Sequence, residues 1–66
     1  MIEVTIPYDG DEMEILAWCK TNIGQMARHR SHVGELYPWY PSARFAHTVF
    51  MLAREQDAFI FKLRWL

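Results

Sequence analysis

The chain opens with a short segment in which apolar and polar residues alternate. In residues 2–6, Ile2-Glu3-Val4-Thr5-Ile6, every even position is apolar and most side chains are β-branched. A period of two with β-branched residues is typical of a strand that has one buried face. Pro7 follows, so we expect a strand over residues 2–6.

A helix is expected directly after this strand. Asp11 and Glu14 stand three positions apart, as in a capping box, and acidic residues in a first turn are favoured by the helix dipole. Gly24 stands where a left-handed cap ends many helices. Between these ends, apolar residues recur at three- and four-residue spacing: Ile15, Leu16, Trp18, Cys19 and Ile23.

The next segment, residues 25–44, has no sustained period and contains Gly34, Pro38 and Pro41. We expect a long, partly ordered connection in which Leu36-Tyr37 or Trp39-Tyr40 forms a short edge strand. Loops longer than about 12–15 residues are uncommon in compact domains and are usually functional or disordered. The connection is therefore a place to look for function.

Residues 45–52 form an almost continuous apolar run, which predicts a central strand covered on both faces and lying beside residues 2–6.

The pattern of residues 58–66 is compatible with either a strand or a helix. As a strand, Phe59, Phe61, Leu63 and Trp65 would share one face; as a helix, Ala58, Phe61 and Trp65 would form a stripe. No glycine-bearing turn separates the two runs, and a tight hairpin normally needs one, so the pattern favours the helix.

These elements predict a two-layer α+β domain of order β-α-(β)-β-α, with both helices on one face of a small sheet. The alternative is a C-terminal β-hairpin. A chain of 66 residues is expected to be a single domain, residues 1–66.

Because 52% of its residues are hydrophobic and 15% are aromatic, we expect more apolar surface than so small a core can bury. Large exposed apolar patches mark interaction sites, so a protein partner or a homodimer is expected.

Charge and cysteine content indicate the kind of partner and the cellular compartment to expect. The net charge of −1 provides no general attraction to nucleic acid or anionic membranes. The single cysteine, Cys19, cannot form an internal disulfide, and the N-terminal residues do not resemble a secretion signal. We expect a soluble protein of the cytoplasm that does not enter membranes.

The end of the chain resembles a known group of proteins. A strand followed by Glu55-Gln56-Asp57-Ala58 and then Phe61-Lys62-Leu63-Arg64-Trp65 is similar to the ending of many small uncharacterised proteins of tailed bacteriophages, particularly marine ones. The similarity covers about a third of the chain. It implies a phage origin, a location in the host cytoplasm, and a regulatory or inhibitory role through binding to a host protein, and it implies no catalytic mechanism.

Two patterns have catalytic or metal-binding side chains. His29 and His32, with Cys19 and His47, have the ligand types of a zinc site, but structural zinc usually uses two close pairs and only one occurs here. Cys19 with His47 has the residue types of a nucleophile and its base, yet Cys19 stands among apolar helix positions, where a thiol is expected to be inert. We expect no enzyme activity, no cofactor and no metal.

The strongest functional pattern combines arginines with aromatic rings. It consists of Arg28, Arg30, Tyr37, Trp39, Tyr40 and Arg44. Arginine and aromatic enrichment is typical of protein-binding hot spots, which is the interpretation we favour. The same residue types bind single-stranded nucleic acid, such as RNA, which is the alternative. Trp65 and Leu66 are expected to be exposed and to extend this surface or to form a dimer interface.

Overall fold

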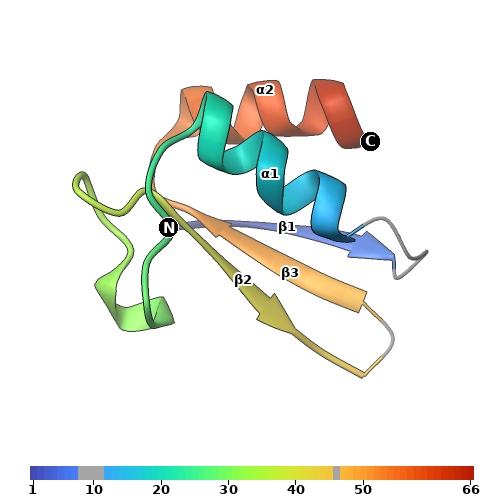
Figure 1. Cartoon of the computed structure of the whole chain (residues 1–66), viewed down its shortest axis with the longest axis horizontal. Coiled ribbons are helices and arrows are strands. Elements are labelled where there is room, and N and C mark those ends of the chain that lie inside the picture. The colour runs from blue at the N-terminus through green and yellow to red at the C-terminus, as the bar shows by residue number, and fades with distance from the viewer. Residues whose placement is uncertain (8–11, 46) are drawn as a thin grey trace.

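In the computed structural model, the chain forms a three-stranded antiparallel sheet with two helices on one face (Figure 1). The structure describes residues 1–7, 12–45 and 47–66. The predicted α+β class, the order β-α-(β)-β-α and the placement of both helices on one face are confirmed. The elements in chain order are β1 (Ile2–Pro7), α1 (Glu12–Asn22), the 3₁₀ turn η1 (Arg30–His32), β2 (Trp39–Ala43), β3 (His47–Leu52) and α2 (Glu55–Trp65). The capping box expected at Asp11 lies outside the described residues.

The strand order is β1-β3-β2, so β3 is the central strand. It pairs with β1 through Val4 and Phe50, and with β2 through Trp39 and Leu52. The edge strand begins at Trp39, one of the two predicted places, and extends to Ala43. The predicted start of the central strand at Phe45 is wrong. Phe45 is fully exposed in the β2–β3 connection, where the Arg44 N–H donates to the His47 carbonyl at 2.8 Å.

The core lies between the sheet and the two helices. The residues that face the helices come from alternate positions of the strands, as the period of two predicts. They join apolar side chains of both helices in one cluster: Val4, Ile6, Ile15, Cys19, Ile23, Trp39, Phe50, Leu52, Ala58 and Phe61. The rings of Phe50 and Phe61 lie 4.9 Å apart between centroids, which places α2 directly against the central strand. On the other face of β3, Val49 and Met51 are also buried, so this strand is covered on both faces as expected.

The last segment is a helix, so the alternative of a C-terminal β-hairpin is wrong. Its buried residues are Asp57, Ala58 and Phe61, which lie on one side of a helix. In a strand, Phe59 and Phe61 would share a face, whereas here Phe61 is fully buried and Phe59 is exposed. Neither helix in the described part of the chain is long and apolar enough to span a membrane.

The end of α1 and the start of α2 are joined by hydrogen bonds. Gly24 has a φ of +139°, which favours glycine although it is more extended than the expected left-handed value of about +57°. Its N–H donates to the Cys19 carbonyl at 3.1 Å. Arg54 Nη2 donates to the Ile23 carbonyl at 3.2 Å, while Arg54 Nε is 2.6 Å from Asp57 Oδ2. One side chain therefore connects the two helices.

Candidate binding surface

The connection before β2 is attached to the fold through Trp39. This side chain is fully buried, and its Nε1 donates to the Gly24 carbonyl at 2.7 Å. The Trp39 carbonyl accepts a bond from the Ala27 N–H at 2.8 Å, and Met26 pairs with Trp39 as a parallel bridge. The prediction that Trp39 contacts a partner is wrong, because its indole belongs to the core. It holds both ends of the loop in place.

An open groove of about 560 Å³ lies beside this anchor. Its walls come from the last turn of α1 and from two parts of the connection. Met26 is 40% exposed and Tyr37 is 41% exposed, so the groove presents apolar and aromatic surface to solvent. The Tyr37 carbonyl accepts a bond from the Gly34 N–H at 3.0 Å, which closes the turn that carries this ring. The lining residues are Lys20, Gly24, Gln25, Met26, Arg28 and Tyr37.

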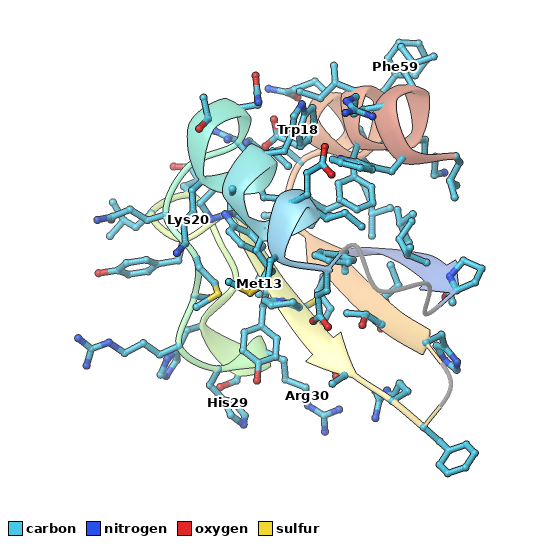
Figure 2. All side chains as sticks on the ribbon, turned by 45° about the vertical axis from the view of Figure 1, so that its right-hand side comes forward. Met13, Trp18, Lys20, His29, Arg30 and Phe59 are labelled. Atoms are coloured by element: carbon cyan, nitrogen blue, oxygen red, sulfur yellow. The ribbon has the colours of Figure 1, made fainter. Side chains whose placement is uncertain are left out.

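Among the described residues that line the groove, two are cations and none is a carboxylate. Lys20 comes from α1 and Arg28 from the connection (Figure 2 labels Lys20), and both are exposed. The sequence pattern identified Arg28 and Tyr37 but missed Lys20 and Met26. No local signal points to Lys20, because it stands in α1 and comes near Tyr37 only through the fold.

The other predicted contact residues lie elsewhere. Arg30 is exposed in η1, while Tyr40 lies on the sheet face opposite Trp39, with its ring 6.4 Å from that of His29. Arg44 follows β2 at its far end, about 16 Å along the strand from Trp39 at ~3.3 Å per residue. The six predicted residues therefore do not form one surface, and only Arg28 and Tyr37 line the groove.

The histidines of the connection make local contacts. His29 Nδ1 is 2.8 Å from Ser31 Oγ and accepts a bond from the Ser31 N–H at 3.2 Å, which caps η1. The His29 and His32 rings lie 6.1 Å apart in an edge-on arrangement. Within residues 1–7, 12–45 and 47–66, no three His, Cys, Asp or Glu side chains come together as metal ligands would.

Cys19 is completely buried in the core between the helices and the sheet. Burial raises the pKa of this thiol from its ordinary value of 9.0 to about 12. A thiol with such a pKa stays protonated at neutral pH and is a poor nucleophile. His47 lies on the opposite face of the sheet, since it alternates with the core residues Thr48 and Phe50 along β3.

At the end of the chain, the structure also differs from the prediction of an exposed surface formed by Trp65 and Leu66. The prediction that Trp65 is exposed is wrong: its ring lies 6.2 Å from that of Trp18, and the Arg64 guanidinium carbon is 4.0 Å from its centroid. Leu66 is exposed as expected, at 70%. It belongs to a larger apolar surface, which we call the outer face of α2: Phe59, Ile60, Leu63 and Leu66.

Comparison with known proteins finds no matching family model, no matching curated protein and no matching solved structure. The functional argument therefore rests on the geometry of the groove and of the outer face of α2.

Proposed function

We propose that this chain is a non-catalytic protein-binding module whose groove receives an acidic segment that carries an apolar side chain. The observation that carries the proposal is the lining of the groove. Lys20 and Arg28 provide positive charge beside the exposed side chains of Met26 and Tyr37, and no carboxylate lines the groove within the described part of the chain.

Each part of the lining suits this class of ligand. Arginine binds carboxylates through paired N–H donors, and lysine attracts them as a point charge. Tyrosine provides a large contact area at a low cost in side-chain entropy, and methionine adapts to differently shaped apolar groups. Because Trp39 fixes the loop on Gly24 and Ala27, little ordering of the backbone accompanies binding.

Single-stranded nucleic acid is the alternative ligand, and the lining of the groove favours it less. Sites for single strands stack successive bases on several aromatic side chains, whereas Tyr37 is the aromatic residue among those that line the groove.

The role of such binding follows from the resemblance to small phage proteins. We propose that the chain acts in the host cytoplasm and regulates or inhibits a host protein by occupying an acidic segment of it. The apolar side chain would contribute affinity, and the carboxylates would orient the segment.

The test uses a short fluorescein-labelled peptide in which Asp and Glu residues flank one Phe. We expect the anisotropy of this probe to rise with protein concentration and the affinity to fall with added salt. Arg28→Glu should weaken binding about tenfold, because an attraction becomes a repulsion. Tyr37→Ala should weaken it about fivefold or more by removing the apolar contact.

Arg44→Glu is the matched control, since it makes the same change of charge at an exposed arginine outside the groove. It should leave the affinity within about twofold of the unaltered chain. Equal losses for the two arginine variants would show that only net charge matters. A labelled oligo(U) bound more tightly than the peptide, with loss on Arg28→Glu, would replace the proposal by the nucleic-acid alternative.

A further inference from the structure

We propose that the free edge of β1 pairs with the same edge of a second copy of this chain, so that the two sheets join into one antiparallel sheet. The strand order β1-β3-β2 leaves β1 and β2 as the two edges of the sheet (Figure 1). The proposal is independent of the proposed function, because the groove lies at the start of β2, beside Trp39, and not at β1.

The hydrogen bonds between β2 and β3 establish which backbone groups of the sheet point outward. The Ala53 N–H donates to the Pro38 carbonyl at 2.9 Å. At the other end of the pair, the Arg44 N–H donates to the His47 carbonyl at 2.8 Å. Because hydrogen-bonded positions alternate along an antiparallel pair, the odd-numbered residues of β2 direct their backbone groups away from β3. By the same alternation, the even-numbered residues of β3 direct theirs toward β1.

The outer edge of β1 therefore consists of the N–H and carbonyl groups of Glu3 and Thr5. Val4 pairs with Phe50, whose backbone groups point toward β1, so its two neighbours direct their groups away from the sheet. Glu3 and Thr5 are both exposed, and no backbone group of the described residues bonds to them on the outer side. Unpaired edges of this kind are templates for the addition of another strand.

The edge of β2, by contrast, is protected at Trp39 and at Pro41. The outward carbonyl of Trp39 accepts a bond from the Ala27 N–H at 2.8 Å. Pro41 is the next outward residue and has no N–H to donate. Prolines and covering loops are common protections of sheet edges, and neither protects the described backbone of β1 between Ile2 and Ile6. The edge of β1 is therefore the one that suits strand addition.

The edge of β1 matches itself under a two-fold rotation centred on Val4. In this register Glu3 lies opposite the partner's Thr5, and each of the two symmetric pairs exchanges main-chain hydrogen bonds. Val4 lies beside the partner's Val4, and cross-strand pairs of β-branched residues are favourable. Pro7 falls opposite the partner's Met1 at the end of the ladder, where its missing N–H interrupts no inner pair.

The neighbouring registers lack this fit. A shift of two residues in one direction places Glu3 opposite the partner's Glu3, and like charges directly opposite are destabilising. The same shift in the other direction places Pro7 opposite the partner's Glu3, whose carbonyl then has no donor. The outward groups, the charge and the proline of β1 therefore agree on one symmetric register, which identifies a second copy as the occupant of the edge.

The size of the contact sets its strength. A few main-chain hydrogen bonds and one valine pair bury less than the ~1,200–2,000 Å² of stable complexes, so we expect a dissociation constant of about 10–100 µM. The two grooves would lie at the β2 edges, far from the new contact. The dimer would therefore present both grooves and bind a bivalent partner with increased avidity.

Sedimentation equilibrium of the whole chain tests the proposal. Between about 1 µM and 1 mM protein, the mean mass should rise from 7.9 kDa toward twice that value. Thr5→Pro removes an outward N–H from the edge of β1 and should raise the dissociation constant more than about tenfold. Ala43→Pro is the matched control: it removes an outward N–H at the exposed end of β2 and should dimerise like the unaltered chain. Circular dichroism of both variants verifies the fold.

A charge at position 5 tests the register. Because Glu3 lies opposite the partner's Thr5, Thr5→Lys should tighten the dimer about threefold. Thr5→Glu should weaken it about threefold or more, and added salt should reduce both effects. A register that places Thr5 opposite the partner's Thr5 would weaken both variants equally, and that result would overturn the register centred on Val4.

Amide hydrogen exchange of the unaltered chain locates the contact without a substitution. Exchange of the Glu3 and Thr5 N–H groups should slow as the protein concentration rises, whereas exchange at Ala43 should not change. A dimer in which Glu3 and Thr5 still exchange rapidly would overturn the proposal, as would equal losses for Thr5→Pro and Ala43→Pro. A chain that stays at 7.9 kDa at every concentration would also overturn it, and the edge would then suit a strand of another protein.

Discussion

At the scale of single residues, Trp39 and Trp65 place the same indole in two different environments. Trp39 is fully buried, donates from Nε1 to the Gly24 carbonyl at 2.7 Å and stacks on Phe50 at 6.5 Å. Trp65 is half-buried, and its Nε1 has no hydrogen-bond partner among the described residues. The indole N–H is therefore expected to contribute to the stability of the fold at Trp39 but not at Trp65.

Replacing each tryptophan by phenylalanine measures this difference. Trp39→Phe should lower the free energy of unfolding by about 2–4 kcal/mol, since it leaves the Gly24 carbonyl unsatisfied and opens a cavity. Trp65→Phe should lower it by less than about 1 kcal/mol, because it removes an N–H without a partner. Urea denaturation of both variants gives the two values. Equal losses would show that the bond to Gly24 contributes little.

Cys19 provides a second prediction at this scale. Since it is fully buried with a pKa raised to about 12, a thiol reagent such as DTNB should label the folded protein at pH 8 about 100-fold more slowly than the protein in urea. Absorbance of the released thiolate follows the reaction, with glutathione as the reference thiol. Rapid labelling without denaturant would contradict the buried position.

The raised pKa of Cys19 also predicts how stability depends on pH. The folded state holds the thiol proton more tightly than the unfolded state, so the stabilisation by this group is fully present below pH 9.0 and is lost as the pH rises toward about 12. Cys19→Ala should show a smaller loss of stability over this range in thermal unfolding curves. An identical pH dependence in both proteins would contradict the assignment to Cys19.

At the scale of elements, the start of α2 depends on the pair Arg54 and Asp57. Asp57 is buried in the first turn, and Arg54 contacts both its carboxylate and the Ile23 carbonyl at the end of α1. A carboxylate near a helix N-terminus is also favoured by the dipole. The pair therefore stabilises one helix and attaches it to the other.

Asp57→Asn should lower the free energy of unfolding by about 1–3 kcal/mol, because it weakens a charge-assisted hydrogen bond in a largely buried place. Glu55→Gln is the matched control: it removes a carboxylate from the same turn at an exposed position and should cost less than about 1 kcal/mol. Thermal or urea unfolding measures both. A larger loss for Glu55→Gln would mean that the dipole, rather than the pair, dominates.

At the scale of the whole molecule, the surplus of apolar surface inferred from composition is present. Phe45, Phe59 and Leu63 are 105%, 64% and 71% exposed, while the core is filled by other rings. The large exposed hydrophobic side chains lie in several separate places, among them the β2–β3 connection, the groove and the outer face of α2. Composition predicts the amount of such surface, but its division into separate places is a property of the fold.

Because the groove and the outer face of α2 share no lining residue, we expect them to act independently. Leu63→Glu should leave the affinity for the acidic peptide within about twofold of the unaltered chain. Fluorescence anisotropy of the labelled peptide with this variant and with the unaltered chain measures the two affinities. Loss of peptide binding in Leu63→Glu would show that the outer face of α2 takes part in binding the peptide.

Local patterns in the sequence determined the elements with a clear period. The alternation in residues 2–6 predicts β1, the three- and four-residue spacing up to Ile23 predicts α1, and the missing glycine turn distinguishes α2 from a strand. These features are local because a strand or a helix repeats its buried face every two or about 3.6 residues. Arg28 and Tyr37 were also identified, by residue type alone.

Tertiary structure alone decided which residues each side chain contacts. Trp39 and Tyr40 are neighbours with similar rings, yet the pleat turns the first into the core and leaves the second on the opposite face. Lys20 and Tyr37 are 17 residues apart and meet in the groove only because Trp39 attaches the loop to the end of α1. Composition and spacing indicate which chemical roles a residue is capable of. Its neighbours in space depend on packing between distant parts of the chain, which a local sequence pattern does not specify.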